Sequence, residues 1–344
     1  MPSIVGGLDI HRKQLTFDYL DTGTGEVKRG QIAPADREHL RRWLGRFENV
    51  EGVAFAAEAC TGWRYVVEEL QRAQVEPHLA EPADTAAARG RKKRAKTDKT
   101  DARLLRELLA AGRVPECWIP PAQVLECRAL LEFYHDLRRD HTAWVQRVHA
   151  TLFHQGAPAF HALGEAGGPQ QLTALAREHL SVAGQAQIAV CLRTLDALET
   201  DLETMRRHLV SVARHVRGAK VLAESIYGVG PITGLALTCW LGGAGRFTSA
   251  RKAVRFCGLD VTVYSSAGKR SPGHLSRQGP PVLRWCTYEA GKTHARAAAP
   301  DHPYYASVKD RIDGKRAALA EARKIIRRAC HILTELGDNA FTAV

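Results

Sequence analysis

Four acidic residues in the first third of the chain are the strongest candidates for chemistry. Asp9 and Glu58 each come at the end of a short apolar run, and Asp98 and Asp101 lie three positions apart at the expected start of a helix. Each acid alone also fits a turn or a helix N-terminus. Together they would repel one another unless a cation neutralised them, and such hard oxygen ligands suit Mg²⁺ or Mn²⁺. Because two such ions can stabilise the attacking and leaving oxygens of a phosphodiester, the four acids predict metal-dependent phosphoryl transfer.

Basic residues are concentrated around Asp98. They are Arg91, Lys92, Lys93, Arg94, Lys96 and Lys99. Such a run is often only a solvated loop, but beside metal-binding carboxylates it is typical of a grip on a phosphate backbone. The chain has a net charge of +12, which favours a polyanionic partner over a basic surface that serves solubility alone.

A glycine-rich turn follows an expected helix at about residue 228. Gly228 and Gly230 form a GxG pattern, but Thr233 stands where a dinucleotide-binding loop has glycine, and a helix rather than a strand precedes it. Helix, GxG turn and helix is the arrangement of a helix-hairpin-helix element, whose backbone N–H groups bind a nucleic-acid phosphate. A plain turn between two helices is the alternative.

Two adjacent serines, Ser265 and Ser266, lie in a loop of small residues in the last third of the chain. A serine hydroxyl is a poor nucleophile until a neighbour orients it, accepts its proton or stabilises the attacked phosphate. Four basic residues nearby are candidates for that last role: Lys269, Arg270, Arg277 and Arg284. Serine in such a loop more often only forms a turn, so the local chemistry alone leaves the nucleophile open.

The first 110 residues alternate between strand and helix patterns, which must position the four acids. The predicted strands are 4–10, 14–20, 26–33, 53–57 and 75–80, and the predicted helices are the segment after Asp36, 62–73 and 100–111. Three antiparallel strands followed by helix, strand, helix, strand and helix predict an α/β domain with a mixed sheet. If the first and fourth strands are neighbours, the four acids can meet at one edge of that sheet.

The remainder of the chain is expected to be mainly helical. A stripe of apolar residues from Leu192 to Val212 is typical of a long amphipathic helix or coiled-coil arm, and packing within the chain and dimerisation explain it equally well. The tail, 338–344, is expected to fray. We predict three regions: 1–120, an α/β catalytic domain; 121–218, a helical coiled-coil or dimerisation region; and 219–337, a C-terminal domain with the candidate serine.

Composition excludes several classes of protein. The 344 residues are 45% hydrophobic and 25% charged, which excludes disorder throughout and a low-complexity fibre. No apolar run approaches the length of a membrane span. The eight cysteines form no CxxC pair and do not stand at zinc-finger spacing, so we expect reduced thiols in a cytoplasmic protein.

Several segments resemble transposases of the insertion sequence 110 family. The N-terminal matches are Gly-Leu-Asp-Ile at 7–10, Glu-Ala-Cys-Thr-Gly-Trp at 58–63 and Lys-Thr-Asp-Lys-Thr-Asp-Ala-Arg at 96–103, which are similar to the DEDD motifs of that family. The C-terminal matches are Gly-Val-Gly-Pro at 228–231, Arg-Phe at 246–247, Gly-Leu at 258–259, Ser-Ser-Ala at 265–267 and Leu-Arg at 283–284. The resemblance covers most of the chain, with matching order and spacing.

The resemblance implies a RuvC-like, ribonuclease-H-type N-terminal domain in which Asp9, Glu58, Asp98 and Asp101 hold the metal. It also implies a mainly helical C-terminal transposase domain in which Ser266 is the covalent nucleophile on DNA. The usual Gln-Ser-Gly segment of the family is Ser-Ser-Ala here, so Ser265 is the reserve candidate. The implied partners are the DNA of the element ends and target, a non-coding bridge RNA, and further copies of the chain in a homodimer or homotetramer. The implied location is the bacterial cytoplasm, at the nucleoid when DNA is bound.

We therefore predict a site-specific DNA recombinase that moves its own element and binds Mg²⁺ or Mn²⁺. Two alternatives stay open. One is a RuvC-like, metal-dependent, structure-specific nuclease in which water attacks and no serine is needed. The other is a nucleic-acid-binding scaffold without enzymatic activity, whose acids only cap helices and form turns.

Overall fold

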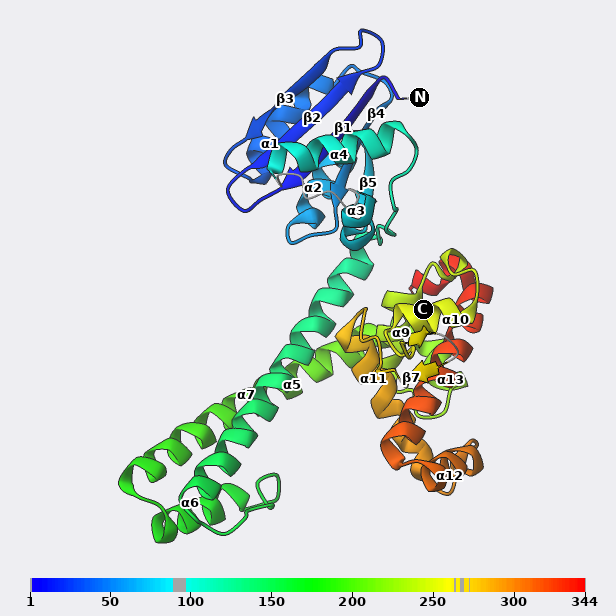
Figure 1. Cartoon of the computed structure of the whole chain (residues 1–344). Helices are drawn as coiled ribbons and strands as arrows, with labels where there is room; N and C mark the ends of the chain where they lie inside the picture. Colours follow the sequence, from blue (N-terminus) through cyan, green and yellow to red (C-terminus); the bar gives the residue numbers. More distant parts are fainter. Residues whose placement is uncertain (1, 89–96, 263, 267–268, 272, 344) are drawn as a thin grey trace. The chain divides into compact units, whose positions relative to one another are not determined.

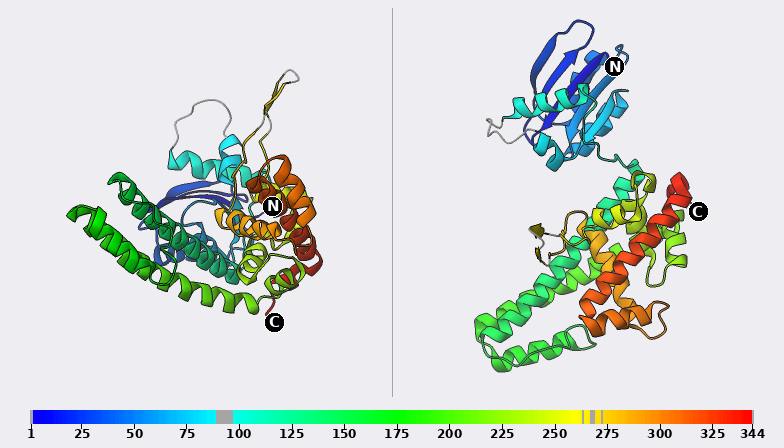
Figure 2. Two further views of the ribbon diagram at one scale, coloured as in Figure 1. Left: turned by 90° about the horizontal axis from the view of Figure 1, so that it is seen from below. Right: turned by 45° about the vertical axis from the view of Figure 1, so that its right-hand side comes forward.

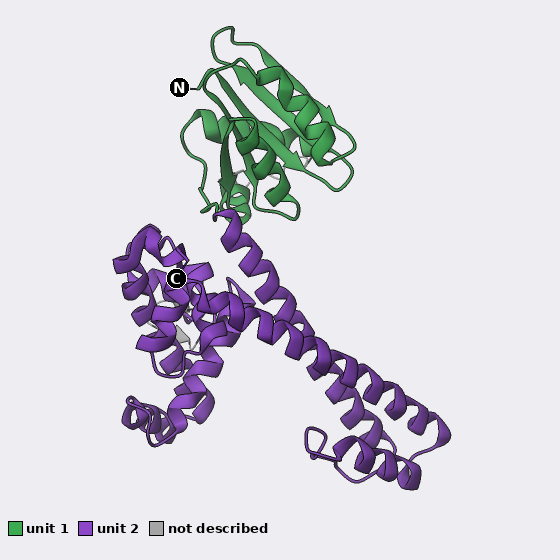
Figure 3. Ribbon diagram, turned by 180° about the vertical axis from the view of Figure 1, so that it is seen from behind, with its two compact units in different colours: residues 1–120 green, residues 121–344 purple. Residues whose placement is uncertain are grey.

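The chain divides into two units, residues 1–120 and 121–344, which are green and purple in Figure 3. The computed structural model describes residues 2–88, 97–262, 264–266, 269–271 and 273–343, with the backbone alone at 264–266 and 269–271. The helices of the predicted middle region, 121–218, and those of the predicted C-terminal domain, 219–337, belong to the same unit.

A five-stranded sheet forms the centre of the first unit (Figure 1). Its strands are β1 (Ile4–Ile10), β2 (Leu15–Asp21), β3 (Val27–Ile32), β4 (Val53–Glu58) and β5 (Glu76–Ala80). Their order across the sheet is β3-β2-β1-β4-β5, with β1 antiparallel to β2, β2 antiparallel to β3, and β1, β4 and β5 parallel. The predicted mixed α/β fold is confirmed and is consistent with a RuvC-like domain, and β1 and β4 are neighbours.

Helices cover both faces of this sheet. They are α1 (Arg37–Leu44), α2 (Trp63–Arg72), α3 (Pro82–Ala88) and α4 (Asp98–Ala110). Side chains alternate along β4, so that Phe55 and Ala57 join the core formed with α1 and α2, whereas Ala56 packs with Leu105 of α4 on the opposite face. Helix α4 therefore packs on the face of the sheet opposite to the one that α1 and α2 cover.

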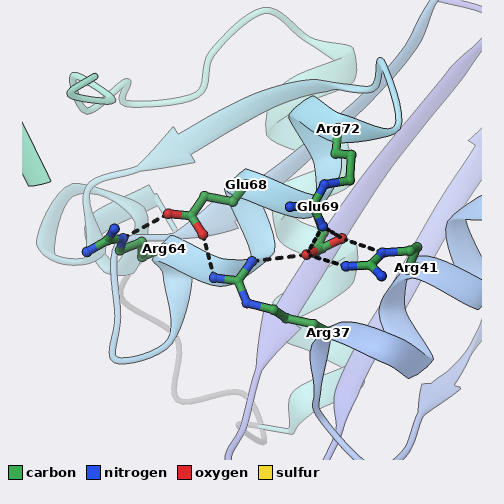
Figure 4. Close-up of polar contacts among 6 residues, drawn as sticks. All are labelled: Arg37, Arg41, Arg64, Glu68, Glu69 and Arg72. Carbon is green, nitrogen blue, oxygen red and sulfur yellow. Dashed lines mark hydrogen bonds and ion pairs between the residues drawn. The ribbon is translucent and has the colours of Figure 1, made fainter. Parts of the chain in front are cut away.

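Helices α1 and α2 are joined through one buried carboxylate (Figure 4). Glu69 of α2 is fully buried, and its oxygens lie 3.0 Å from Arg37 Nη1, 3.1 Å from Arg41 Nε and 2.6 Å from Arg72 Nη1. Burial acts to raise the pKa of Glu69, but the hydrogen bonds from Arg41 and Arg37 outweigh it and the pKa is lowered. The ionised carboxylate therefore stabilises the pairing of the two helices.

The described part of the second unit is mainly helical. Its helices are α5 (Ala122–His154), α6 (Gly168–His179), α7 (Val182–Arg214), α8 (Arg217–Ser225), α9 (Pro231–Leu241), α10 (Ala250–Phe256), α11 (Pro281–Lys292), α12 (His302–Arg311) and α13 (Gly314–Leu336), and its strands are β6 (Tyr264–Ser266) and β7 (Lys269–Ser271). Figures 1 and 2 show α5 and α7 side by side in a long arm. Helices α9 and α11 both pack on α13. No helix among the described residues is long and apolar enough to cross a membrane.

The apolar stripe of α7 packs partly within the chain. Leu195 and Leu209 are buried, whereas Leu198, Leu202 and Met205 between them are half-buried. Contact with α5 and neighbouring helices therefore accounts for the two ends of the stripe, and the middle keeps exposed apolar surface.

The end of the chain is ordered, so the expectation that 338–344 frays is wrong for the described residues up to Ala343. A short 3₁₀ helix spans Gly337–Phe341, and its Ala340 is fully buried. The Arg217 N–H donates to the Thr342 carbonyl at 3.1 Å, and Val216 pairs with Ala343 in an isolated β-bridge. These backbone bonds hold the tail against the start of α8.

We expect Glu69→Gln to lower the local unfolding free energy of α1 and α2 by about 1–3 kcal/mol at neutral pH, because three arginines lose their buried anion but remain hydrated. A lowered folded pKa stabilises the fold above the usual pKa of 4.5 and loses that effect as the pH falls. The difference between the wild type and the variant should therefore shrink below about pH 4.

The measurement is amide hydrogen exchange of peptides from 37–44 and 63–72 in the full chain. Glu38→Gln is the matched control, because Glu38 is 75% exposed and pairs only with Arg42 among the described residues. Its effect should stay within about 0.5 kcal/mol. Equal effects of the two substitutions would contradict the role assigned to Glu69.

Candidate active site

Asp9 and Glu58 lie side by side at the ends of two parallel strands. In the register of β1 and β4, Leu8 is aligned with Ala57, so the next residues on the two strands are Asp9 and Glu58. Leu8 and Ala57 belong to the core on the side of α1 and α2. Because side chains alternate along a strand, both carboxylates point to the opposite face, where α4 lies.

The first turn of α4 supplies the other two acids. A capping box begins the helix: the Thr97 hydroxyl accepts from the Thr100 N–H at 3.3 Å, and the Thr100 hydroxyl accepts from the Thr97 N–H at 3.0 Å. Asp98 and Asp101 follow directly, and Asp101 is buried. The positive end of the helix dipole favours carboxylates at these positions.

Helix α4 crosses β1 at very short range. A Cβ at Gly7 would overlap the carbonyl oxygen of Ala102 and lie 2.7 Å from the Arg106 nitrogen. A side chain at this position would therefore push the helix away from the strand. Glycine at position 7 lets the first turn of α4 approach the end of β1, two residues further along.

A buried ion pair fixes α4 on the sheet. Arg106 Nε lies 2.8 Å from Asp18 Oδ1, and Arg29 Nε lies 2.6 Å from Asp18 Oδ2. The side chains of Asp18 and Arg106 are 2% and 10% exposed. The sequence analysis missed this pair. The sequence does contain a signal for it. Arg106 lies on the same apolar face of α4 as Ala102 and Leu105, where a charge without a partner would be costly.

Asp9 is near enough to the other three acids for their charges to act on it, and a ligand atom of Asp98 lies within 4.8 Å of one from Asp9. The pKa of Asp9 is raised to about 6, chiefly by burial; His11 acts to lower it, and the charges of Asp101, Asp98 and Glu58 act to raise it. Asp9 Oδ2 is buried and accepts no well-formed hydrogen bond from the described residues, with His11 Nε2 at 3.3 Å. The ionised carboxylate is therefore poorly satisfied where it stands, which is the condition that a bound cation relieves.

His11 lies between two of these acids and was also missed. Its Nε2 is 3.3 Å from Asp9 Oδ2 and 3.3 Å from Asp98 Oδ1, and ligand atoms of these three residues all lie within 4.8 Å of one another. Gln14 Nε2 donates to Asp98 Oδ2 at 3.2 Å. The pattern Asp9-Ile10-His11 contains the signal, because residues two apart on a strand share a face.

Cys60 lies close to the same carboxylates. It follows β4 and is half-buried. Burial raises the pKa of its thiol, and the charges of Glu58 and Asp9 raise it further. All eight cysteines of the chain are free thiols, as expected.

A second cluster of possible metal ligands lies in the second unit. It consists of His294, Asp301 and Glu321. Here cations of the protein already accompany the acids: Lys324 Nζ is 3.5 Å from Asp301 and 3.4 Å from Glu321, and Arg328 is 2.9 Å from Asp301. This cluster is therefore less suited to a metal ion than the site around Asp9.

The basic residues predicted to bind nucleic acid in the first unit are described only in part. Lys99 is exposed on α4 and lines a cavity of about 410 Å³ together with Asp18 and Arg29. Arg91, Lys92, Lys93, Arg94 and Lys96 lie outside the described residues.

The glycine turn of the second unit joins α8 to α9. Gly228 has φ +81°, and a Cβ there would overlap Thr293 Oγ1 and lie 2.8 Å from the Ala290 carbonyl oxygen. Packing against the end of α11 thus explains why glycine stands at 228. Gly230 caps α9 and is exposed, and a Cβ there would meet no atom within 4 Å.

The predicted serine segment forms the hairpin of β6 and β7. In its register Ser265 is paired with Arg270 and Ser266 with Lys269, and their side chains lie outside the described residues. Arg284 Nη1 donates to the carbonyl oxygens of Gly279 at 2.6 Å and Cys257 at 3.4 Å, so this nitrogen holds the backbone. Arg277 is exposed and has the unusual φ of +53°.

Comparisons with known proteins agree with this arrangement. Residues 6–154 match a family model described as "Transposase", of the DEDD type found in IS110 elements, and residues 220–306 match the "Transposase IS116/IS110/IS902 family". A probable family 20 transposase from Pseudomonas aeruginosa is 24% identical over 287 residues, which are 78% of this chain and 82% of that relative. Membership of the DEDD family suggests dependence on a divalent metal ion. With both parts of the chain matched in the order that the family requires, this protein belongs to the IS110 family of DNA transposases.

Proposed function

We propose that this transposase cleaves and rejoins DNA with the carboxylates of the first unit and with Ser266 as nucleophile. The observation that carries the proposal is geometric: Asp9 and Glu58 follow aligned residues at the ends of β1 and β4, and Asp98, in the same first turn of α4 as Asp101, has a ligand atom within 4.8 Å of one from Asp9. Holding four acids together costs stability, so a role that uses their charge is a better explanation than capping or turn formation.

The donor set fits hard divalent cations. Asp9, Glu58, Asp98 and Asp101 offer carboxylate oxygens, and one buried oxygen of Asp9 has no well-formed hydrogen bond from the described residues. We propose that these four residues hold Mg²⁺ or Mn²⁺, which when bound supplies charge stabilisation for a reacting phosphate. His11 lies between Asp9 and Asp98, so a bound metal ion would compete with it for their carboxylate oxygens.

The other residues of the site orient the carboxylates and bind the backbone of DNA. Gly7 and the pair of Asp18 with Arg106 hold the first turn of α4 over the end of β1. Lys99 is exposed beside Asp98, and we propose that it contacts phosphates together with the basic residues at 91–96.

The proposed cleavage is a displacement at phosphorus. The Ser266 oxygen forms a bond to the phosphorus of the scissile phosphodiester while the bond from phosphorus to the leaving sugar oxygen breaks. The serine proton leaves with the attack, and the leaving oxygen ends as a hydroxyl. Rejoining is the reverse reaction with a new sugar hydroxyl, and it needs no external energy source because the phosphoserine bond keeps the energy of the original link.

We also propose guidance by a bridge RNA and assembly into a homodimer or homotetramer. The net charge of +12 supports binding to nucleic acid. The half-buried middle of the α7 stripe, at Leu198, Leu202 and Met205, supports contact with another copy of the chain. Recombination must hold two DNA duplexes together, and several copies can do this more readily than one.

The first prediction about the carboxylate site concerns the protein without bound metal. The pKa of Asp9 is raised from its usual 3.8 to about 6, so the fold disfavours the ionised form. The contribution of Asp9 to the unfolding free energy should therefore fall as the pH rises from about 4 to about 6, by up to about 3 kcal/mol at 1.36 kcal/mol per pKa unit. Asp9→Asn should remove this loss and be more stable than the wild type at about pH 7.

Urea denaturation in EDTA and in MnCl₂ measures this effect. Mn²⁺ should stabilise the wild type at neutral pH, and the variant much less, because binding to the folded state alone adds to stability. Asp84→Asn, which removes an exposed acid of α3, is the control for loss of one charge. The metal assignment fails if Mn²⁺ stabilises the wild type and Asp9→Asn equally.

The second prediction separates chemistry from binding. Asp98→Ala should abolish DNA strand cleavage and leave the affinity for nucleic acid within a few-fold, because the basic residues supply the affinity. Gel assays of cleavage and fluorescence anisotropy of binding make the two measurements, with Asp84→Asn again as the control. Cleavage at the wild-type rate by Asp98→Ala would remove this residue from the active site.

The third prediction separates a recombinase from a nuclease. Denaturing gels of a stalled reaction should show a covalent adduct of protein and DNA that disappears in Ser266→Ala. If Ser266→Ala cuts DNA at the wild-type rate and no adduct is ever trapped, water is the nucleophile and the protein acts as a RuvC-like nuclease. If the adduct is lost in Ser265→Ala instead, Ser265 is the nucleophile.

A further inference from the structure

A large cavity lies in the second unit beside the base of the β6–β7 hairpin. Its volume is about 790 Å³, within the usual range for small-molecule sites. Val261 and Leu275, which form a β-bridge just outside the hairpin, are on one side, and residues of α12 and α13 are on the other. The site assigned above to the carboxylates does not involve this cavity.

The charges around the cavity are mostly positive. Four arginines line it: Arg277, Arg311, Arg316 and Arg323. Arg316 is paired with Asp313 at 2.7 Å. The other three have no ion pair within 4.0 Å among the described residues, although Asp260 lies near enough to Arg323 to act on its pKa. Arg323 is the most enclosed of the three, since burial is the largest influence on the pKa of its guanidinium and lowers it, and its Nε donates to the Leu259 carbonyl at 2.7 Å.

Arg277 has a backbone conformation that costs free energy for any residue with a side chain. Its φ of +53° lies in the left-handed region, where a non-glycine residue is strained by about 1–3 kcal/mol. The surrounding loop fixes it: the Arg277 N–H donates to the Gly258 carbonyl at 3.1 Å, and the Ser276 N–H donates to the Asp260 carbonyl at 3.0 Å. Glycine would adopt this conformation more easily, so the loop holds an arginine beside the cavity in spite of the strain.

The remaining lining is suited to a planar ring. Tyr304 is 44% exposed, and Ile312 beside it is 48% exposed. The ammonium group of Lys324 lies 3.7 Å from the centre of the Tyr304 ring. An aromatic side chain with apolar neighbours and guanidinium groups is the combination that binds a base together with its phosphate.

We infer that this cavity holds one unpaired nucleotide of the nucleic acid on which the transposase acts, with the base at Tyr304 and the phosphate at Arg277 and Arg311. A single-stranded or distorted segment supplies such a nucleotide at little cost, whereas an intact duplex must first unstack a base. The inference rests on the proposed function for its ligand. The cavity would give the nucleic acid a second point of attachment, at the base of the hairpin that contains Ser266.

The test uses the full chain and a short single-stranded DNA with one central 2-aminopurine, whose fluorescence falls when it stacks on an aromatic ring. Binding should quench the probe with the wild type and with Tyr304→Phe, which keeps the ring. Tyr304→Leu should lose the quenching and bind the strand about tenfold more weakly, while binding to a fully paired duplex of the same sequence should not change. Arg311→Gln should also weaken single-strand binding.

Arg207→Gln is the matched control, because this arginine lies on α7 with a 70% exposed side chain and carries the same charge. It should affect both DNAs by no more than a small, equal factor. Unchanged quenching and affinity in Tyr304→Leu would overturn the inference, as would an equal loss for single strand and duplex. Failure of the wild type to bind any nucleic acid would instead contradict the proposed function.

Discussion

The contact between α4 and β1 is the constraint on which the carboxylate site depends. At Gly7 the backbone of the helix lies against the strand without an intervening side chain. Four like charges gather at the end of this contact and push the two elements apart. Two contacts one or two turns further along α4 oppose that repulsion. One is the Asp18–Arg106 ion pair, and the other is the packing of Leu105 on Ala56 and Ala80. Favourable contacts in the middle of α4 thus offset the repulsion among the acids at its start, as is common where a site is built from charged groups.

The two units have complementary chemistry. In the first, acids are brought together at the edge of a rigid sheet, and Lys99 is the described cation nearest to them in the sequence. In the second, guanidinium groups gather between helices and a short hairpin, with few acids to balance them. A phosphate backbone is attracted by the second kind of surface, whereas the first kind repels it until cations are present. We propose that the protein holds DNA with the second kind of surface and breaks it with the first.

Much of the first unit could be predicted from sequence because its strands are apolar runs with clear turns between them. Asp9 and Glu58 could be placed because strand ends are visible in the pattern, and Asp98 and Asp101 because they stand three positions apart at the expected start of a helix; the structure adds the capping box of Thr97 and Thr100 that begins this helix. Helix α3 was missed since its short, alanine-rich segment has no apolar period. Local sequence patterns could not predict what Gly228 packs against or that the C-terminal tail is ordered. Both depend on contacts between residues far apart in the chain. Arg277 was noticed as a basic residue, but its left-handed backbone and the cavity beside it were not predictable.

Cys60 gives the carboxylate site a chemical reporter of its own. Only the thiolate form of cysteine reacts rapidly with alkylating reagents, and the charges of Glu58 and Asp9 suppress that form here. Cys257, by contrast, is buried far more completely and is shielded from such reagents. The alkylation rate of Cys60 therefore follows the net charge of the acids beside it, and neutralising them makes this thiol more reactive without any label being introduced into the protein.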